Sequence, residues 1–184
     1  FVIVQNEDYV TDMIPLGIEW GDYGIMDAIC STEFQKTNIT RYFPYLRTKV
    51  LEPYIPGYFK KPVKPKKLIV NILAKDQKYV NKIVKSFYWQ YPIYKFVAFR
   101  DLRNFPKHMF ADLLKEGAIT VWVDRETKFG NSCLEALKCG NIVIGQIPDK
   151  EQKWMVSEDG SLRDNCVWFN DIEDVPKLLA NVVN

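Results

Sequence analysis

The sequence is poor in the residues that build metal and disulfide sites. It holds one histidine and four cysteines among 184 residues, and the spacing of the cysteines, at positions 30, 133, 139 and 166, is not that of zinc ligands. The histidine, His108, falls in the first turn of a predicted helix, with no cysteine or carboxylate at ligand spacing. We therefore expect no metal site and no cofactor, and cysteines that stay reduced in a cytoplasmic protein.

Long apolar runs and several common catalytic motifs are also absent. No run approaches the roughly 18 apolar residues of a membrane-spanning helix, and we expect no secretory leader. The sequence has no Gly-x-Gly-x-x-Gly after a strand, no P-loop lysine motif and no Gly-x-Ser-x-Gly elbow, which weighs against dinucleotide-binding, kinase-like and hydrolase functions. Because the chain opens on Phe1 inside an apolar run, we expect it to start within a longer protein.

Charge and composition fit an ordinary soluble α/β protein. The net charge of +2 gives no reason to expect a nucleic-acid partner, and the length allows one packed domain with a smaller attachment. One stretch is strongly basic, Lys60-Lys-Pro-Val-Lys-Pro-Lys-Lys67, and its prolines favour an extended backbone. It is interpreted either as a solvated linker or as a segment attracted to an anionic membrane surface.

From Lys67 onward, strand patterns alternate with helix patterns. Strands are predicted over 68–73, 94–99, 119–123, 142–144 and 166–169, and helices over 76–90, 106–116, 131–139, 150–156 and 172–183, the last capped by Asp171. This alternation predicts a Rossmann-like α/β domain, a parallel sheet with helices on both faces. Ligands of such sheets bind beyond the carboxyl ends of the strands, and the loop over 127–132 leaves the sheet at such an end.

Residues 1–59 have a different organisation. Strands are predicted over 1–4 and 26–30, followed by a helix that is capped by Ser31 or Thr32 and runs to Phe43, and by an extended segment over 49–54. We therefore expect three parts. Residues 1–59 are the tail of one domain, residues 60–67 are a Lys/Pro linker, and residues 68–184 are a ligand-binding Rossmann-like domain.

The helix predicted over 131–139 has the features of a nucleotide site. After Gly130 the chain offers Asn131 and Ser132 as N-caps, and Gly140 suits the left-handed residue that ends a helix. Unpaired amides at the positive end of a helix favour phosphate. About one turn inside, Glu135 can lean back toward that end and accept both hydroxyls of a ribose. The alternative is that Glu135 is an ordinary solvated helix residue.

The segments Phe129-Gly130, Leu134-Glu135-Ala136-Leu137 and Cys139-Gly140-Asn141-Ile142-Val143-Ile144 together resemble the donor-binding signature of retaining GT-B glycosyltransferases. The similarity covers roughly 67–180, is specific over 127–145, and extends weakly to 27–59, which is similar to the end of the family's acceptor-binding half. It implies the C-terminal half of a GT-B fold. It also implies that Glu135 holds the ribose of a nucleotide-diphosphate sugar, while the backbone from Phe129 and Gly130 through Asn131 and Ser132 meets its phosphates or sugar.

The resemblance also implies roles for residues around this motif. The family's first glutamate, which faces the donor sugar, stands eight positions before the second; here that position is Thr127, with Glu126 beside it. Lys75 and Lys78 follow the first strand of the domain, where the family places cations that stabilise the leaving diphosphate. The alternative is that both lysines are solvated at a helix start. Arg100, after the next strand, is a weaker candidate, and Arg103, Lys107 and Lys115 are assigned to surface charge.

The function that the resemblance implies is sugar transfer in polysaccharide or glycan biosynthesis. A hexosyltransferase would move a sugar, with retained configuration and without a metal, from a nucleotide-diphosphate sugar to a saccharide or a lipid-linked acceptor. UDP is the favoured nucleotide, and the location would be cytoplasmic or peripheral at the inner face of the membrane. This portion alone is expected to bind without turnover. Two alternatives stay open: a non-catalytic nucleotide-sugar-binding or partner-docking module, and a nucleotide-sugar epimerase of the same architecture.

Overall fold

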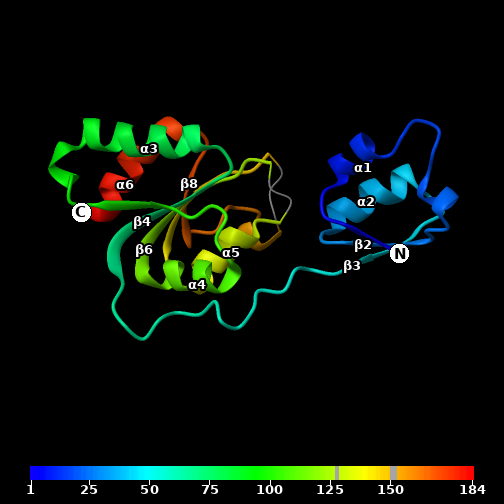
Figure 1. The fold of residues 1–184 in the computed structure, drawn as a ribbon, viewed down its shortest axis with the longest axis horizontal. Helices are drawn as coiled ribbons and strands as arrows, with labels where there is room; N and C mark the ends of the chain where they lie inside the picture. Colours follow the sequence, from blue (N-terminus) through cyan, green and yellow to red (C-terminus); the bar gives the residue numbers. More distant parts are fainter. Residues whose placement is uncertain (127–128, 150–152) are drawn as a thin grey trace. The chain divides into compact units, whose positions relative to one another are not determined.

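The computed structural model describes residues 1–126, 129–149 and 153–184. These residues form two compact units, Phe1–Tyr54 and Ile55–Asn184 (Figure 1). The units divide between Tyr54 and Ile55, whereas the sequence pattern placed the boundary at residue 59.

The first unit is a small parallel sheet with two helices. Its strands β1 (Val2–Val4), β2 (Asp27–Cys30) and β3 (Arg47–Val50) pair in the order β1-β2-β3, and they are joined by α1 (Glu7–Met13), the 3-10 helix η1 (Trp20–Tyr23) and α2 (Glu33–Tyr42). Helix α2 begins at Thr32, whose hydroxyl oxygen accepts the N–H of Gln35 at 3.1 Å. Helix α1 was not predicted, and the extended segment expected over 49–54 continues as strand only to Val50.

The second unit has the predicted α/β architecture. Five parallel strands pair in the order β5-β4-β6-β7-β8: β4 (Lys67–Ala74), β5 (Ala98–Asp101), β6 (Gly117–Val123), β7 (Ile142–Gln146) and β8 (Cys166–Phe169). Helices α3 (Gln77–Gln90) and α6 (Val175–Val183) cover one face, and α4 (Lys107–Glu116) and α5 (Asn131–Lys138) cover the other (Figure 1). The prediction of a Rossmann-like parallel sheet with helices on both faces is confirmed.

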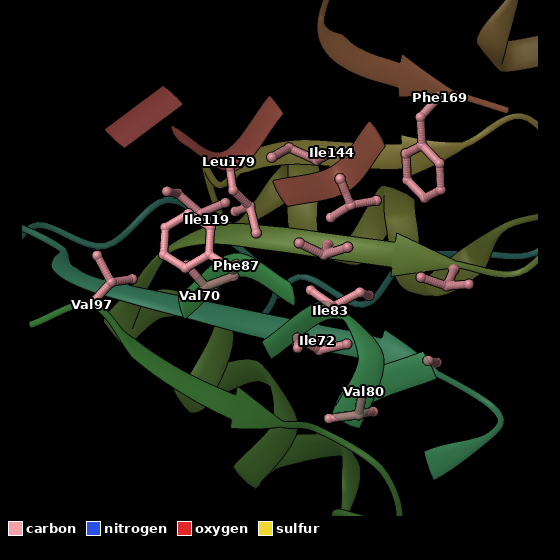
Figure 2. Packing of buried hydrophobic residues seen from close by; sticks show 14 of the residues in the cluster. Val70, Ile72, Val80, Ile83, Phe87, Val97, Ile119, Ile144, Phe169 and Leu179 are labelled. Carbon is pink, nitrogen blue, oxygen red and sulfur yellow. The ribbon is translucent and has the colours of Figure 1, made fainter. Parts of the chain in front are cut away.

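Strand residues alternate between two hydrophobic cores, as expected for a sheet covered on both sides. Val70 and Ile72 of β4 pack under α3 and α6 together with Phe87 and Leu179 (Figure 2). Leu73, their neighbour in the strand, packs on the opposite side with α4 and α5. The four cysteines are buried.

Three predicted elements differ in the structure. The strand expected over 94–99 begins four residues later, as β5, and follows a 3-10 helix, η2 (Pro92–Tyr94), because the ring of Tyr94 stacks on Phe87 with centroids 5.9 Å apart. In place of the helix expected over 150–156, the described part is a 3-10 helix, η3 (Lys153–Met155). The last helix is preceded by a 3-10 turn, η4 (Ile172–Asp174), whose N-cap is Asp171 as predicted.

The basic segment before β4 packs against the second unit. Phe59 is fully buried against Phe110 of α4, and Lys138 Nζ donates to the carbonyl oxygen of Ile55 at 2.9 Å. Lys66 Nζ donates to three carbonyl oxygens at the end of α4, those of Leu114, Lys115 and Gly117, at 2.8, 3.2 and 2.9 Å. Burial lowers the pKa of Lys66. Residues 55–66 therefore form a strap along α4 and α5.

Candidate functional site

The order of the strands creates a crevice at the carboxyl edge of the second unit. Strand β4 comes first along the chain and lies between β5 and β6, so the connections from β4 and β5 leave toward opposite sides. In open α/β sheets, ligands bind at this switch point, beyond the carboxyl ends of the strands. A cavity of about 350 Å³, here named the switch-point cavity, lies there and is lined by Leu73, Ala74, Lys75, Arg103, Asn104, Trp122, Val123, Asp124 and Ser132.

A second cavity adjoins the first along the same edge. It has a volume of about 620 Å³ and shares Lys75, Val123 and Asp124 with the switch-point cavity. Its other lining residues come from the ends of β7 and β8, the start of α3 and the loop after β6: Tyr79, Arg125, Glu126, Gln146, Asn170, Asp171 and Ile172. Together the two cavities are large enough for an extended polar ligand.

Lys75 lies where the two cavities meet. Its Nζ is 3.1 Å from Asp124 Oδ1 and 3.9 Å from Glu126 Oε2. The structure thus brings together two predicted site residues, Lys75 and Glu126, and adds Asp124, which the sequence interpretation missed. Its position directly after a buried strand was the available signal.

Lys78, the second predicted cation, points elsewhere. Its Nζ lies 3.2 Å from Asp76 Oδ2 and 5.1 Å from the ring centroid of Tyr79, and it lines neither cavity. The backbone N–H of Lys78 donates to Asp76, which lowers the pKa of this N-cap carboxyl, and the contact with Asp76 raises the pKa of Lys78.

The two arginines of this region also differ from expectation. Arg103, assigned to surface charge, lines the switch-point cavity, and Asp101 holds its guanidinium at 2.7 and 2.9 Å. Arg100 donates to Glu116 Oε2 at 2.8 Å, and Lys67 contacts the other oxygen of that carboxylate at 2.7 Å. Since Glu116 immediately precedes β6, Arg100 reaches toward the amino-terminal edge and lines neither cavity.

The start of α5 is built around Gly130. Its backbone is left-handed, with φ of 78°, and its carbonyl accepts the N–H groups of Cys133 and Leu134 at 3.0 and 3.1 Å. A Cβ at this position would lie 2.9 Å from Trp154 Cζ2, so glycine is required by both conformation and space. Gly130 takes the N-cap position predicted for Asn131 and Ser132, and these two become the first helical residues because only glycine fits the turn.

Two tryptophans, Trp122 and Trp154, lie beside Gly130 at the start of α5. Trp154 Nε1 donates to the carbonyl oxygen of Phe129 at 2.5 Å. Trp122 is 1% exposed, and its Nε1 has no hydrogen-bond partner among the described residues. Trp122 lines the switch-point cavity, and a Cβ on Gly130 would lie 3.4 Å from its Cζ2 and Cη2 atoms.

Glu135 is buried and paired, so the interpretation of a solvated helix residue is wrong. Its side chain is 4% exposed, and Oε1 lies 2.7 Å from Nζ of Lys107, the first residue of α4. Oε2 is buried without a hydrogen-bond partner in the described part of the chain. The Lys107 ammonium also lies 5.8 and 5.5 Å from the ring centroids of Phe59 and Phe110. Lys107, assigned to surface charge, is therefore a site residue that the sequence interpretation missed.

The remaining expectations concern the loop before α5, a metal site and a membrane-spanning helix. Thr127, the predicted sugar-facing residue, lies outside the described residues. Asn131 is exposed, and Ser132 lines the switch-point cavity. Within the described ranges there is no group of three or more histidine, cysteine or acidic side chains that could hold a metal ion. Among the same residues, no helix has the length and apolar character needed to cross a membrane.

The sequence was compared with protein-family models and with curated proteins. No family model matches the sequence, and no curated protein matches it significantly.

Proposed function

We propose that the second unit binds a nucleotide-diphosphate sugar and forms the donor-binding part of a retaining GT-B glycosyltransferase. The proposed acceptor is a saccharide or a lipid-linked saccharide, and UDP is the favoured nucleotide. One observation supports this most directly: Glu135 is a buried glutamate one turn after Ser132, which lines the switch-point cavity, although Glu135 itself lines neither cavity. Ser132 and Glu135 share a helix face because they are three residues apart.

The switch-point cavity suits the diphosphate. Two cationic side chains, Lys75 and Arg103, line it together with one carboxylate, Asp124. The first amides of α5 add the positive end of a helix dipole at Ser132. An entering phosphate would compete with Asp124 for Lys75, whose side chain is 66% exposed. When the bond between the sugar and the diphosphate breaks, the electron pair stays on the phosphate oxygen, where these donors stabilise it.

Glu135 offers the ribose fewer acceptors than the sequence suggested. Lys107 already occupies Oε1, so Oε2 is the oxygen that lacks a donor among the described residues. An unpaired buried oxygen on a carboxylate is costly, and a ligand hydroxyl would relieve that cost. The proposed contact is therefore one strong hydrogen bond from one ribose hydroxyl.

A second candidate is a nucleotide-sugar-binding module without transferase activity. It is favoured by the state of the two lysines proposed to stabilise the leaving group. Asp124 and Glu126 flank Lys75, and Asp76 pairs with Lys78. Cations that are already neutralised contribute less to stabilising new negative charge.

The test is calorimetric titration of the 184-residue chain with UDP, GDP and ADP. We expect saturable binding of one nucleotide, weakened about tenfold or more in Glu135→Gln, which loses a hydrogen bond to a charged acceptor. Asp112→Asn is the matched control, because Asp112 is an exposed acid on α4 whose contact is Lys115. A folded chain that binds none of the three nucleotides would refute the proposal.

Lys75→Met separates the two candidates. If Lys75 meets the β-phosphate as a transferase requires, the variant binds UDP more weakly but UMP equally well. If Lys75 stays paired with Asp124 and Glu126 in the complex, the variant binds UDP and UMP as tightly as wild type does. That result would favour a binding module without transferase activity.

A further inference from the structure

Residues 77–100 have an unusual charge distribution. This segment spans α3, η2 and most of β5, and it contains four lysines, one arginine and no acidic residue. The chain as a whole has nearly balanced charge, with 25 basic and 23 acidic residues. Acidic residues outside the segment pair with three of these cations, Lys78 with Asp76, Lys82 with Glu173 and Arg100 with Glu116. Lys85 and Lys95 are left to attract an anionic partner.

Three large apolar side chains are exposed where this segment turns from α3 into β5. Trp89 is 76% exposed, Ile93 77% and Phe96 68%. Lys85 lies on the same helical face as Trp89, four residues earlier, and Lys95 adjoins Phe96. Both lysines are exposed, and neither has an ion-pair partner among the described residues. We name these five residues the aromatic-basic surface.

The residues between them fix this surface on the folded core. Tyr91 and Tyr94 contact the buried ring of Phe87, with centroids 5.9 Å away in both cases. The hydroxyl of Tyr88 donates to the carbonyl oxygen of Val97 at 2.6 Å. Because every third residue of the turn is anchored inward, Trp89, Ile93 and Phe96 between them stay exposed.

The aromatic-basic surface is separate from the candidate nucleotide site. It lies beside the beginning of β5, at the amino-terminal edge of the sheet, whereas both cavities are lined by residues at the carboxyl ends of the strands. None of its five residues lines either cavity. Its role is therefore independent of nucleotide binding.

We propose that the aromatic-basic surface docks the second unit on an anionic lipid membrane. Tryptophan and phenylalanine partition into the interface of a bilayer, an aliphatic side chain such as Ile93 enters the acyl boundary, and lysines at the rim attract anionic headgroups. A nucleic acid would gain no stacking from Ile93. A second copy of the chain would bring lysine against lysine.

This proposal moves the membrane contact away from the Lys/Pro segment. In that segment Lys66 is bound by three carbonyl oxygens, Lys67 pairs with Glu116, and the aliphatic stem of Lys61 lies against Gly140. Lys60 and Lys64 are exposed, but no exposed aromatic side chain adjoins them, so they contribute less to binding at a bilayer interface than Lys85 and Lys95.

The test is cosedimentation of the full chain with vesicles made of equal parts phosphatidylcholine and phosphatidylserine, and with vesicles of phosphatidylcholine alone. We expect binding to the anionic vesicles, weaker binding at high salt, and little binding to the neutral ones. The triple variant Trp89→Ser, Ile93→Ser, Phe96→Ser should reduce binding at least tenfold. Met109→Ser with Val63→Ser is its control, because both side chains are exposed and apolar but lie elsewhere on the unit.

A charge comparison completes the test. Lys85→Gln with Lys95→Gln should weaken binding several-fold, whereas Lys60→Gln with Lys64→Gln, which removes the same charge from the Lys/Pro segment, should leave it unchanged. The proposal is overturned if the wild-type chain does not bind anionic vesicles, or if the Lys60 and Lys64 variant is the one that fails. Dimerisation of the wild-type chain that the triple variant abolishes would also overturn it, by assigning the surface to a second copy.

Discussion

The Glu135 carboxylate is almost fully buried, and Lys107 Nζ lies 2.7 Å from it. The stability of the buried negative charge therefore depends on this ammonium group. Removing one partner of such a pair leaves the other charge without compensation. Lys107 itself is 62% exposed, which reduces the effect through solvent screening.

We predict that Lys107→Met lowers the free energy of unfolding by about 1–2 kcal/mol, the cost of leaving a buried charged acceptor unpaired. Urea denaturation checks this, with Lys36→Met as a control because Lys36 contacts the exposed Glu33. In a double-mutant cycle with Glu135→Gln, the two losses should not add. Additive losses would show that the contact does not hold Glu135.

Ribose hydroxyls offer a second prediction at this scale. Because Oε1 is occupied by Lys107, we expect one hydroxyl of a bound nucleotide to meet Oε2. Removing that hydroxyl should weaken binding about tenfold, as for a hydrogen bond to a charged group. Removing the other should have little effect. Calorimetry with the 2′-deoxy and 3′-deoxy forms measures both, and equal losses would contradict a single contact.

The sequence could identify Glu135 but not its surroundings. A glycine-opened helix with a carboxylate one turn inside is a local pattern, and it is visible along the chain. Lys107 lies 28 positions away on another helix, and its contact with Glu135 depends on how α4 and α5 pack side by side on the sheet. No periodicity in the sequence reports that packing.

At the scale of elements, the end of α4 depends on a residue outside the helix. Lys66 donates to two of its terminal carbonyl oxygens, those of Leu114 and Lys115, and to that of Gly117, which follows the helix. Carbonyls at the end of a helix have no helical partner of their own. We predict that Lys66→Met lowers the free energy of unfolding by about 1–3 kcal/mol, since these groups are partly buried. Lys64→Met is the control on the same segment, and a urea titration that finds the two variants equal would refute the role.

Glu116 joins four elements, because it ends α4, adjoins β6, and binds Arg100 of β5 and Lys67 of β4. Hydrogen bonds from Lys67 and then Arg100 lower its pKa below the ordinary value of 4.5. A carboxyl whose folded pKa is lowered stabilises the protein fully above its unfolded pKa, and this contribution is lost as the pH falls through the folded value.

We therefore predict that Glu116→Gln is less stable than wild type at pH 7, and that the difference shrinks as the pH falls below 4.5. Thermal unfolding across this range measures the effect. Glu52→Gln, an exposed acid in the first unit, should show no such convergence. A difference that is constant with pH would mean that the charge of Glu116 is not what stabilises the edge.

Element positions were predictable where periodicity was strong, as in α3, β6 and β8. The residues 91–97 were not, because their aromatic and β-branched side chains resemble a strand while their contacts are with Phe87 of α3. Tertiary stacking overrode the local preference there. The cap at Gly130 was missed for a related reason: its requirement comes from Trp154, a distant ring.

At the scale of the molecule, each unit has its own hydrophobic core. We predict that residues 55–184 expressed alone fold cooperatively, and that residues 68–184 are markedly less stable because they lack Phe59 and Lys66 of the strap. Near-ultraviolet circular dichroism and urea unfolding of the two chains check this. Equal stability would mean that the strap contributes nothing to the fold.

The strand order also has a consequence for biosynthesis. Strand β4 is the first of its sheet to leave the ribosome, and its two neighbours in the sheet, β5 and β6, follow it. The face that holds Val70 and Ile72 is completed by Leu179 and Ala180 of α6, which is translated after all five strands of the sheet. A nascent chain halted before α6 therefore presents an open apolar face, and such an intermediate is prone to aggregate unless a chaperone shields it.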